Sequence, residues 1–274
     1  MQENDLKKMY FSQLALSTYQ QCELKFKKRY LDGLYWPADW GEDQEQKEIV
    51  EKGRLFHRLA RRYYSQGEII FNTQIDKDLK NWIKRLKTFR PFTEKDLFYP
   101  EHVLRLNKDN IKLLAKYDLL YIDSRSGKMI IYDWKTNKKR LKAEELKNSI
   151  QSKVYLYVLA KAGAQYSIEN QIAPENIKII YWNPRYPHDW FEFFYDRESL
   201  KRDEKDIREQ IKLIQNKDFD NLKEKSEDRI CRYCEYRPIC QGKKAENIEP
   251  KDDEIKLDPV WEEVEEVQFT GEGL

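Results

Sequence analysis

The chain is poor in several features that define particular protein classes. Its 274 residues include only four cysteines, nine glycines, nine prolines and three histidines. Four cysteines are too few for a small disulfide-stapled domain, and so little glycine and proline excludes a collagen-like chain. No run approaches the ~20 apolar residues that a membrane helix needs, and the polar start makes a poor secretory signal. We therefore expect a globular protein of the cytoplasm with no membrane partner, and its 40% hydrophobic residues allow a sizeable core.

The formal net charge of +2 hides an uneven distribution of charge along the chain. Residues 246–274 carry eleven acidic residues and two lysines, a net charge of −9, which leaves 49 basic and 38 acidic residues, or +11, in the rest. A basic body suits a polyanionic partner, and the acidic tail could fold over the same surface. Charge alone equally allows a surface that only keeps the protein in solution.

Hydrophobic periodicity predicts a mixed order of helices and strands. Apolar residues at helical spacing follow Ser17, which forms a capping-box arrangement with Gln20, and this first helix should end at Asp32-Gly33. Further helices are expected at 49–66, 76–89, 143–161 and 198–215, strands at 98–106, 111–122, 129–134, 177–182 and 190–195, and a polar loop at 37–48. This order predicts an α/β sheet domain with an N-terminal helical subdomain.

One predicted strand ends in charged residues. Asp133 and Lys135 are two residues apart and share a face of the strand, while Trp134 points the other way. Asp118 is another charge inside an apolar run, and it would converge with Asp133 if the two strands were antiparallel neighbours. Two carboxylates with backbone oxygens suit Mg²⁺ or Mn²⁺, which could activate water for attack on a phosphodiester, with Lys135 neutralising the developing charge. The alternative is an ordinary Asp/Lys pair at a strand end.

Two predicted helices add polar residues to this set. His57 lies on the second helix, and Gln151 and Tyr155 are four residues apart on one face of a later helix. The full set, in chain order, is His57, Asp118, Asp133, Lys135, Gln151 and Tyr155. Its order resembles that of the motifs in the RecB-type branch of the PD-(D/E)XK nuclease superfamily, over roughly residues 14–242.

The resemblance implies a restriction-endonuclease-like fold, with a central mixed sheet flanked by helices, and metal-dependent hydrolysis of DNA. It implies that the metal is held by His57, Asp118, Asp133 and the backbone carbonyl of Trp134. It also implies that the catalytic set comprises Asp118, Asp133, Lys135, Gln151 and Tyr155, of which the last two touch substrate. Glu101 matches an acidic position that the family often has one strand earlier, and Ala115 stands where the family has glycine.

The four cysteines are arranged as one plus three. Cys231, Cys234 and Cys240 follow a C-x₂-C-x₅-C spacing, and Cys22 lies more than two hundred residues earlier. This spacing looks more like a four-thiolate iron–sulfur site than a zinc site with two close pairs, and free thiols are the remaining alternative. The layout is similar to the iron–sulfur subset of the same branch, which includes the AddB nuclease domain and the CRISPR-associated RecB-like exonucleases. That resemblance implies a [4Fe-4S] cluster on all four cysteines and a C-terminal iron–sulfur knuckle.

Basic residues close to the motifs could contact a nucleic acid. Arg54, Arg58 and Arg61 are three or four residues apart beside His57, and Lys138 follows the charged strand. They would neutralise phosphates, although a solvated basic helix has the same pattern. The resemblance implies an exonuclease acting on single-stranded DNA or DNA ends, in DNA repair or a CRISPR system, with a helicase or a CRISPR adaptation protein as partner. A non-catalytic DNA-binding or assembly subunit is the alternative function, and a zinc-stabilised binding module is a second.

These patterns divide the chain into four expected regions. They are an N-terminal helical region with the first cluster cysteine at 1–95, a nuclease core at 96–216, a cysteine cluster region at 217–245 and an acidic tail at 246–274.

Overall fold

A computed structural model describes residues 6–34, 44–69, 75–167, 171–222, 229–232 and 234–243. The acidic tail at 246–274 lies outside the described residues. The chain forms two compact units, one of residues 51–208 and one that combines residues 1–50 with 209–274. Within the described residues, no helix is both long enough and apolar enough to cross a bilayer.

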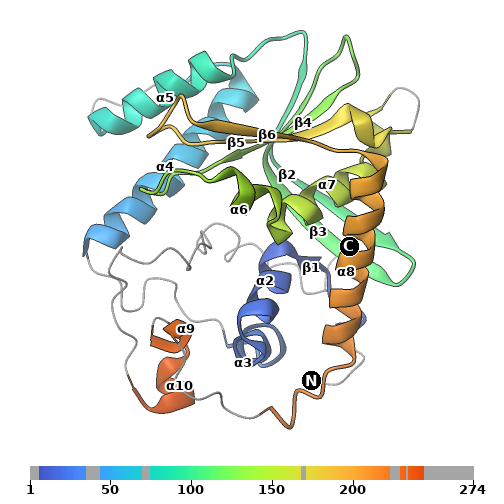
Figure 1. The fold of residues 1–274 in the computed structure, drawn as a ribbon. Coiled ribbons are helices and arrows are strands. Elements are labelled where there is room, and N and C mark those ends of the chain that lie inside the picture. Colours follow the sequence, from blue (N-terminus) through green and yellow to red (C-terminus); the bar gives the residue numbers. More distant parts are fainter. Residues whose placement is uncertain are drawn as a thin grey trace. The chain divides into compact units, whose positions relative to one another are not determined.

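The unit of residues 51–208 is built on a mixed β-sheet (Figure 1). Its strands are β2 (Leu97–Lys108), β3 (Ile111–Ile122), β4 (Met129–Trp134), β5 (Ile177–Trp182) and β6 (Trp190–Phe194), and each of them pairs with the next. The β4–β5 pair is parallel, and the other three pairs are antiparallel. All five strands fall where the sequence pattern predicts them. The mixed sheet with its flanking helices is the architecture that the sequence resemblance implies.

Helices cover both faces of this sheet. Helices α4 (Gln44–Gln66) and α5 (Lys77–Phe89) lie on one side, and α7 (Ile150–Ala162) lies on the other (Figure 1). The apolar stripe of α5 joins Phe56 and Tyr63 of α4 in the core, where both helices pack against Tyr132 of β4 and Trp182 of β5. Helix α5 begins at Asp76, whose carboxylate accepts hydrogen bonds from the Asp78 and Leu79 amides and so caps the first turn.

Two helical expectations in this part of the chain are wrong in detail. The single helix expected at 143–161 is two helices, α6 (Ala143–Lys147) and α7. The Ser149 hydroxyl accepts a hydrogen bond from the Ser152 amide at 3.1 Å and starts α7 afresh, so Gln151 lies in its first turn. Helix α4 begins at Gln44, so the loop expected at 37–48 is helical over 44–48, and residues 37–43 lie outside the described residues.

The second unit contains β1 (Phe11–Ser12), α2 (Gln13–Gln21), α3 (Glu23–Phe26), a π-helix (Lys27–Leu31), the end of α8 (Arg197–Gln215), α9 (Arg229–Arg232) and α10 (Arg237–Gln241). The first helix was expected to begin at Ser17, but its cap is Ser12, whose hydroxyl accepts from the Ala15 amide at 3.1 Å. Cys22 then adopts an extended conformation, with φ −159° and ψ 113°, that splits the expected helix into α2 and α3. The sequence pattern missed this break because apolar spacing continues across it.

Candidate active site

The pairing of β3 with β4 brings the two predicted aspartates together. Leu119 pairs with Tyr132 in the antiparallel register, so Asp118 and Asp133 are the next residues to face each other at the end of β4. The Trp134 backbone amide donates to Asp118 Oδ2 at 2.6 Å. The β4 segment also continues along β5, because the Lys135 amide donates to the Trp182 carbonyl at 2.8 Å. The backbone amides at the charged end of β4 are therefore held on both sides, by the Asp118 carboxylate on β3 and the Trp182 carbonyl on β5.

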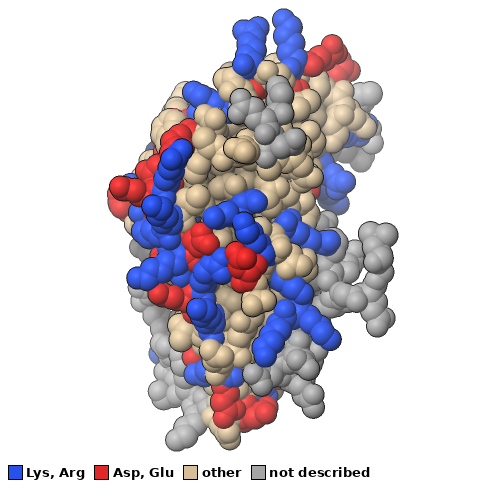
Figure 2. Space-filling view, turned by 90° about the vertical axis from the view of Figure 1, so that its right-hand side faces the viewer, with Lys and Arg blue, Asp and Glu red and all other residues tan. Residues whose placement is uncertain are grey.

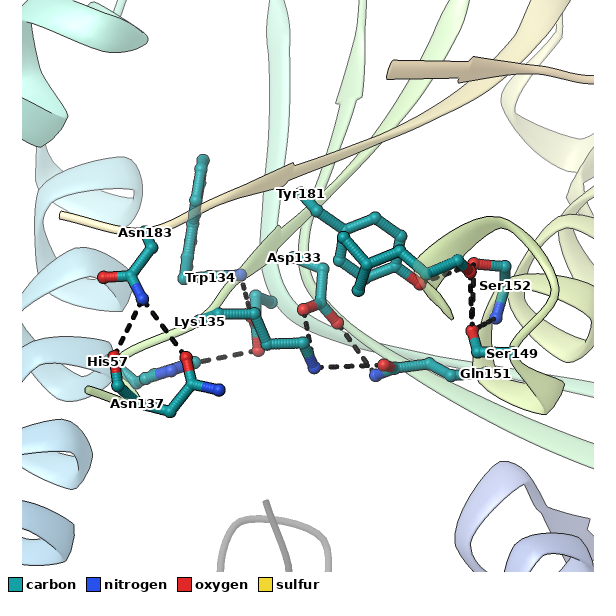
Figure 3. A network of polar contacts seen from close by, with 12 residues as sticks. His57, Asp133, Trp134, Lys135, Asn137, Ser149, Gln151, Ser152, Tyr181 and Asn183 are labelled. Carbon is teal, nitrogen blue, oxygen red and sulfur yellow. Dashed lines mark hydrogen bonds and ion pairs between the residues drawn. The ribbon is translucent and has the colours of Figure 1, made fainter. Parts of the chain in front are cut away.

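Asp133, Lys135 and Gln151 form a closed set of polar contacts (Figure 3). Lys135 Nζ lies 2.9 Å from Asp133 Oδ1 and donates to Gln151 Oε1 at 3.0 Å. Gln151 Nε2 donates to Asp133 Oδ2 at 2.8 Å. Asp133 is only 3% exposed, so both of its oxygens obtain their polar contacts from the protein. The start of α7 after Ser149 is what places Gln151 at this point.

His57, Glu101 and Asp118 form a second cluster next to the first. His57 Nδ1 lies 3.2 Å from Asp118 Oδ1 and 3.9 Å from Glu101 Oε1. One nitrogen and one oxygen from each carboxylate lie within 4.8 Å of one another. Lys116 Nζ contacts the other Glu101 oxygen at 2.9 Å. An imidazole and two carboxylates at this separation suit a hard divalent cation.

Glu101 reaches this cluster through an unusual backbone conformation. Its φ is +51°, in the left-handed region that costs a non-glycine residue of order 1–3 kcal/mol. It interrupts the β2–β3 register between Pro100 and His102. Proline inside a strand commonly marks such an irregularity, because it cannot donate to the ladder. Family resemblance drew attention to Glu101, and Pro100 is the physical signal in the sequence that the strand is distorted there.

The electrostatics of the three carboxylates differ with their surroundings. Burial raises the pKa of Asp133 to about 6, against the opposing influence of Lys135. Burial also raises the pKa of Glu101, and the neighbouring charge of Asp118 adds to that rise. Burial acts in the same direction on Asp118, but its neighbour His57 and the Trp134 amide outweigh it, so that the pKa of Asp118 is lowered. One buried and two half-buried carboxylates are costly to ionise together, and a divalent cation would remove that cost.

Two other residues predicted for the site, Tyr155 and Trp134, have side chains buried in the protein. Tyr155, one turn after Gln151, is buried, and its ring packs edge-on against Tyr117 at 5.2 Å. The Trp134 side chain is buried in the core, where it stacks on Tyr132 at 5.2 Å. Ala115 does not adopt a positive φ, so the methyl group that replaces the family's glycine causes no backbone strain.

Sequence reasoning missed Tyr181 and Ser152, which lie beside the charged end of β4. Tyr181 pairs with Asp133 across β4–β5, and its hydroxyl lies 2.8 Å from Ser152 Oγ (Figure 3). Lys135 Nζ lies 5.7 Å from the centre of the Tyr181 ring. The predicted strands 129–134 and 177–182 have the same length. A parallel pairing that aligns their ends places Tyr181 beside Asp133, and the structure has this register. Burial, with the nearby Asp133 charge, holds the pKa of Tyr181 well above its usual range.

The predicted DNA-contacting residues lie at the surface near these clusters. Arg58, Arg61 and Lys138 are exposed, and Arg54 pairs with Glu51 at 2.9 Å. Elsewhere the charge is mixed: basic and acidic side chains interleave on the face that includes α8 (Figure 2), where Lys161 pairs with Glu204 at 2.9 Å. The charge distribution on that face gives no single-sign surface.

All four cysteines line one cavity of about 50 Å³ in the unit that holds both ends of the chain. None forms a disulfide. The Lys25 amide donates to Cys22 Sγ at 3.4 Å, a contact created by the extended conformation of Cys22. Burial, with Glu235 nearby, raises the pKa of Cys234 to about 12. Among the described residues, no three cysteine sulfurs lie within 4.8 Å of one another.

Comparison with known proteins identifies one family. The model of the PD-(D/E)XK nuclease superfamily matches residues 10–241. Among solved structures, a candidate exonuclease from Eubacterium rectale is 12% identical, with a TM-score of 0.48, over 83% of this chain and 93% of that one. The structure of the protein SSO0001 is 16% identical, with a TM-score of 0.32, over 81% of this chain and 96% of that one. No curated protein matches.

Proposed function

This chain belongs to the PD-(D/E)XK nuclease superfamily of metal-dependent nucleases, and we propose that it hydrolyses DNA as an exonuclease acting on single strands or ends. The observation that carries the proposal is the junction of the two polar clusters at the end of β4. The Trp134 amide binds Asp118 of the His57 cluster, and the adjacent Asp133 and Lys135 belong to the Gln151 cluster.

The donor set fits a hard divalent cation such as Mg²⁺ or Mn²⁺. His57, Glu101 and Asp118 supply a nitrogen and two carboxylate oxygens, all within 4.8 Å. Asp133 and the Trp134 carbonyl are the further ligands that we propose. When bound, such an ion supplies Lewis-acid activation of water and of the scissile phosphate.

The protein residues around this donor set have separate tasks in the proposed reaction. The Lys135 ammonium group lies between Asp133 and Gln151 at the end of β4. It would stabilise the negative charge that develops on the phosphate. Asp133 fixes the position of that ammonium group through the 2.9 Å contact. Gln151 donates to Asp133 and accepts from Lys135, so it orients both groups at once. We therefore assign Gln151 a positioning role, and we keep Tyr155 as a proposed substrate contact.

We propose that the cysteine cavity holds a [4Fe-4S] cluster. Four thiols around one cavity, with an amide N–H directed at Cys22 Sγ, form a donor set that fits such a cluster. A single tetrahedral zinc with ligands at 2.3 Å would need sulfurs about 3.8 Å apart. No three of the described cysteine sulfurs lie within even 4.8 Å of one another, so their arrangement does not match such a zinc site. Free thiols and an iron–sulfur group both suit the cytoplasm, where we place the protein. A helicase or CRISPR adaptation partner stays a prediction.

The decisive experiment is cleavage of labelled single-stranded and duplex DNA, with 5′- or 3′-blocked ends, in Mn²⁺ and in EDTA. We expect Asp133→Ala and Lys135→Ala to abolish cleavage and to leave the brown colour of the cluster intact. Lys178→Ala is the matched control, because Lys178 is also a strand lysine paired with a carboxylate, Glu192 at 2.6 Å. Full activity of Lys135→Ala would overturn the catalytic assignment. Binding of DNA without any cleavage by the unaltered protein would identify a DNA-binding subunit, and a colourless zinc protein would refute the cluster.

A further inference from the structure

A hollow of about 600 Å³ lies in the unit of residues 51–208, apart from the two clusters already described. It is formed by the exposed face of α5, the end of β5 and the turn that leads to β6. Its lining residues are Asn81, Lys84, Arg85, Thr88, Phe89, Trp182, Pro187 and His188. None of these residues is acidic, and none belongs to the proposed catalytic set.

Two aromatic side chains, Phe89 and Trp182, line the hollow, and a third, Trp190, lies next to Phe89. Phe89 stacks on Trp182 with ring centres 4.7 Å apart and planes 10° from parallel. Trp182 is fully buried and supports Phe89 from below. Trp190 pairs with Trp182 across β5–β6, is 46% exposed, and lies 6.2 Å from Phe89. An exposed indole beside a firmly backed phenyl ring is a stacking platform for a planar group.

The wall of the hollow carries positive charge. Helix α5 has five lysine or arginine residues and one acidic residue, Asp78. Lys84 and Arg85 are exposed and line the hollow, with His188 on the opposite side. Arg85 Nη1 donates to the Pro184 carbonyl at 2.7 Å, which ties the helix to the turn. The surface thus combines aromatic faces with cations, in contrast to the mixed charges around α8 (Figure 2).

The turn that borders the hollow is bonded to the segment that follows Lys135. Asn183 Nδ2 donates to the Asn137 carbonyl and side-chain oxygen at 3.0 and 3.1 Å (Figure 3). Arg185 Nε donates to the Thr136 carbonyl at 2.8 Å. A ligand in the hollow would therefore rest on a turn that is continuous, through hydrogen bonds, with the catalytic strand.

We propose that this hollow binds an unpaired base of single-stranded DNA, stacked on Trp190 and Phe89, with a flanking phosphate on Lys84 and Arg85. The inference rests on the proposed nuclease function and deepens it, because it assigns the preference for single strands to a defined subsite. Base faces inside a duplex are covered by their neighbours, so only an unpaired or terminal base can stack on these rings. The cations alone would bind either form.

The test measures binding in EDTA, so that it does not depend on cleavage. Fluorescence anisotropy would give Kd values for labelled oligothymidylate and for a labelled, covalently closed duplex minicircle, which has neither ends nor unpaired loop bases. Trp190→Ala should weaken single-strand binding about tenfold and duplex binding less than twofold. Phe194→Ala is the matched control, because Phe194 is an aromatic residue of the same strand and is 67% exposed. Lys84→Ala should reduce the salt dependence of binding, and Lys80→Ala, on the same helix outside the hollow, should reduce it less.

Photocrosslinking of a 5-iodouracil oligonucleotide should label Trp190 or Phe89. Unchanged single-strand affinity in Trp190→Ala, an equal loss for both DNA forms, or crosslinks confined to other segments would overturn the proposal. These results are separable from the nuclease assay. If the unaltered protein cleaves DNA but Trp190→Ala binds single strands equally well, the hollow proposal alone is refuted. If the unaltered protein does not cleave DNA but Trp190→Ala shows the expected loss of binding, the nuclease proposal alone is refuted.

Discussion

The substitution Gly53→Ala tests how closely α4 must approach Thr136, which follows the candidate site residue Lys135. A Cβ atom at position 53 would lie 2.6 Å from Thr136 Oγ1 and 3.6 Å from Thr136 Cβ. The first distance is a clash, and the second is an ordinary contact. Thr136 is buried and follows Lys135 directly, so displacement of Thr136 would move the end of the strand. Gly53 is therefore needed for packing beside the site, and its φ is an ordinary helical one.

Two effects of this substitution oppose each other. Alanine is favoured over glycine within a helix by about 1 kcal/mol. Forcing a methyl group into a packed contact costs about 1–3 kcal/mol. Gly53→Ala alone should thus destabilise the protein by about 0–2 kcal/mol. In a Thr136→Ala background only the ordinary contact remains, and the same change should stabilise the protein by about 0.5–1 kcal/mol.

A double-mutant cycle measured by urea unfolding would give the coupling between the two positions. The expected coupling is at least about 1 kcal/mol, with a change of sign between the backgrounds. Cleavage by Gly53→Ala should fall and should recover in part in the double variant. Ser65→Ala, at an exposed position of α4, is the control and should show no coupling to position 136. An equal effect of Gly53→Ala in both backgrounds would refute the proposed contact.

Three further predictions concern the clusters. Gln151→Ala should lower cleavage about 10–100-fold with little loss of stability, because Gln151 orients both Asp133 and Lys135; the exposed Gln165→Ala is the control, and equal rates for both would contradict the positioning role. Mn²⁺ affinity should be lower at pH 5.5 than at pH 7.5, since a pKa of about 6 leaves Asp133 mostly ionised at the higher pH and mostly protonated at the lower. Protonation of Asp133 alone gives about a fourfold loss of affinity. Calorimetry that shows the same affinity at both pH values would exclude Asp133 as a ligand. Cys240→Ser should remove the brown absorbance and lower the melting temperature, and an unchanged spectrum would exclude this thiol from the cluster.

The five strands β2 to β6 could be predicted from the sequence to within two residues at each end. Asp133 and Lys135 could be found because charge at the end of an apolar run is costly, and alternation along a strand sets their direction. The partner of Asp133 followed from assuming an antiparallel neighbour, which the β3–β4 register bears out.

Interruptions of helices were harder to predict, because the spacing of hydrophobic residues does not change at them. The spacing of apolar residues runs through Cys22 and through Ser149, yet the backbone interrupts a helix at both. Both breaks shape a candidate site, since one directs an amide at Cys22 Sγ and the other brings Gln151 to Asp133. The distorted backbone of Glu101 is a third case, and only long-range packing determines it. The hollow beside α5 also joins segments about a hundred residues apart, which no short motif describes.

The central claim is that an imidazole and carboxylates from neighbouring strands share one divalent cation beside a catalytic amine. Calorimetric titration of Mn²⁺ into the unaltered protein, Asp118→Asn and Lys135→Ala tests it most directly. The account predicts saturable binding by the unaltered protein, loss of that binding in Asp118→Asn, and retained binding in Lys135→Ala. Mn²⁺ binding by Asp118→Asn that matches the unaltered protein would contradict it.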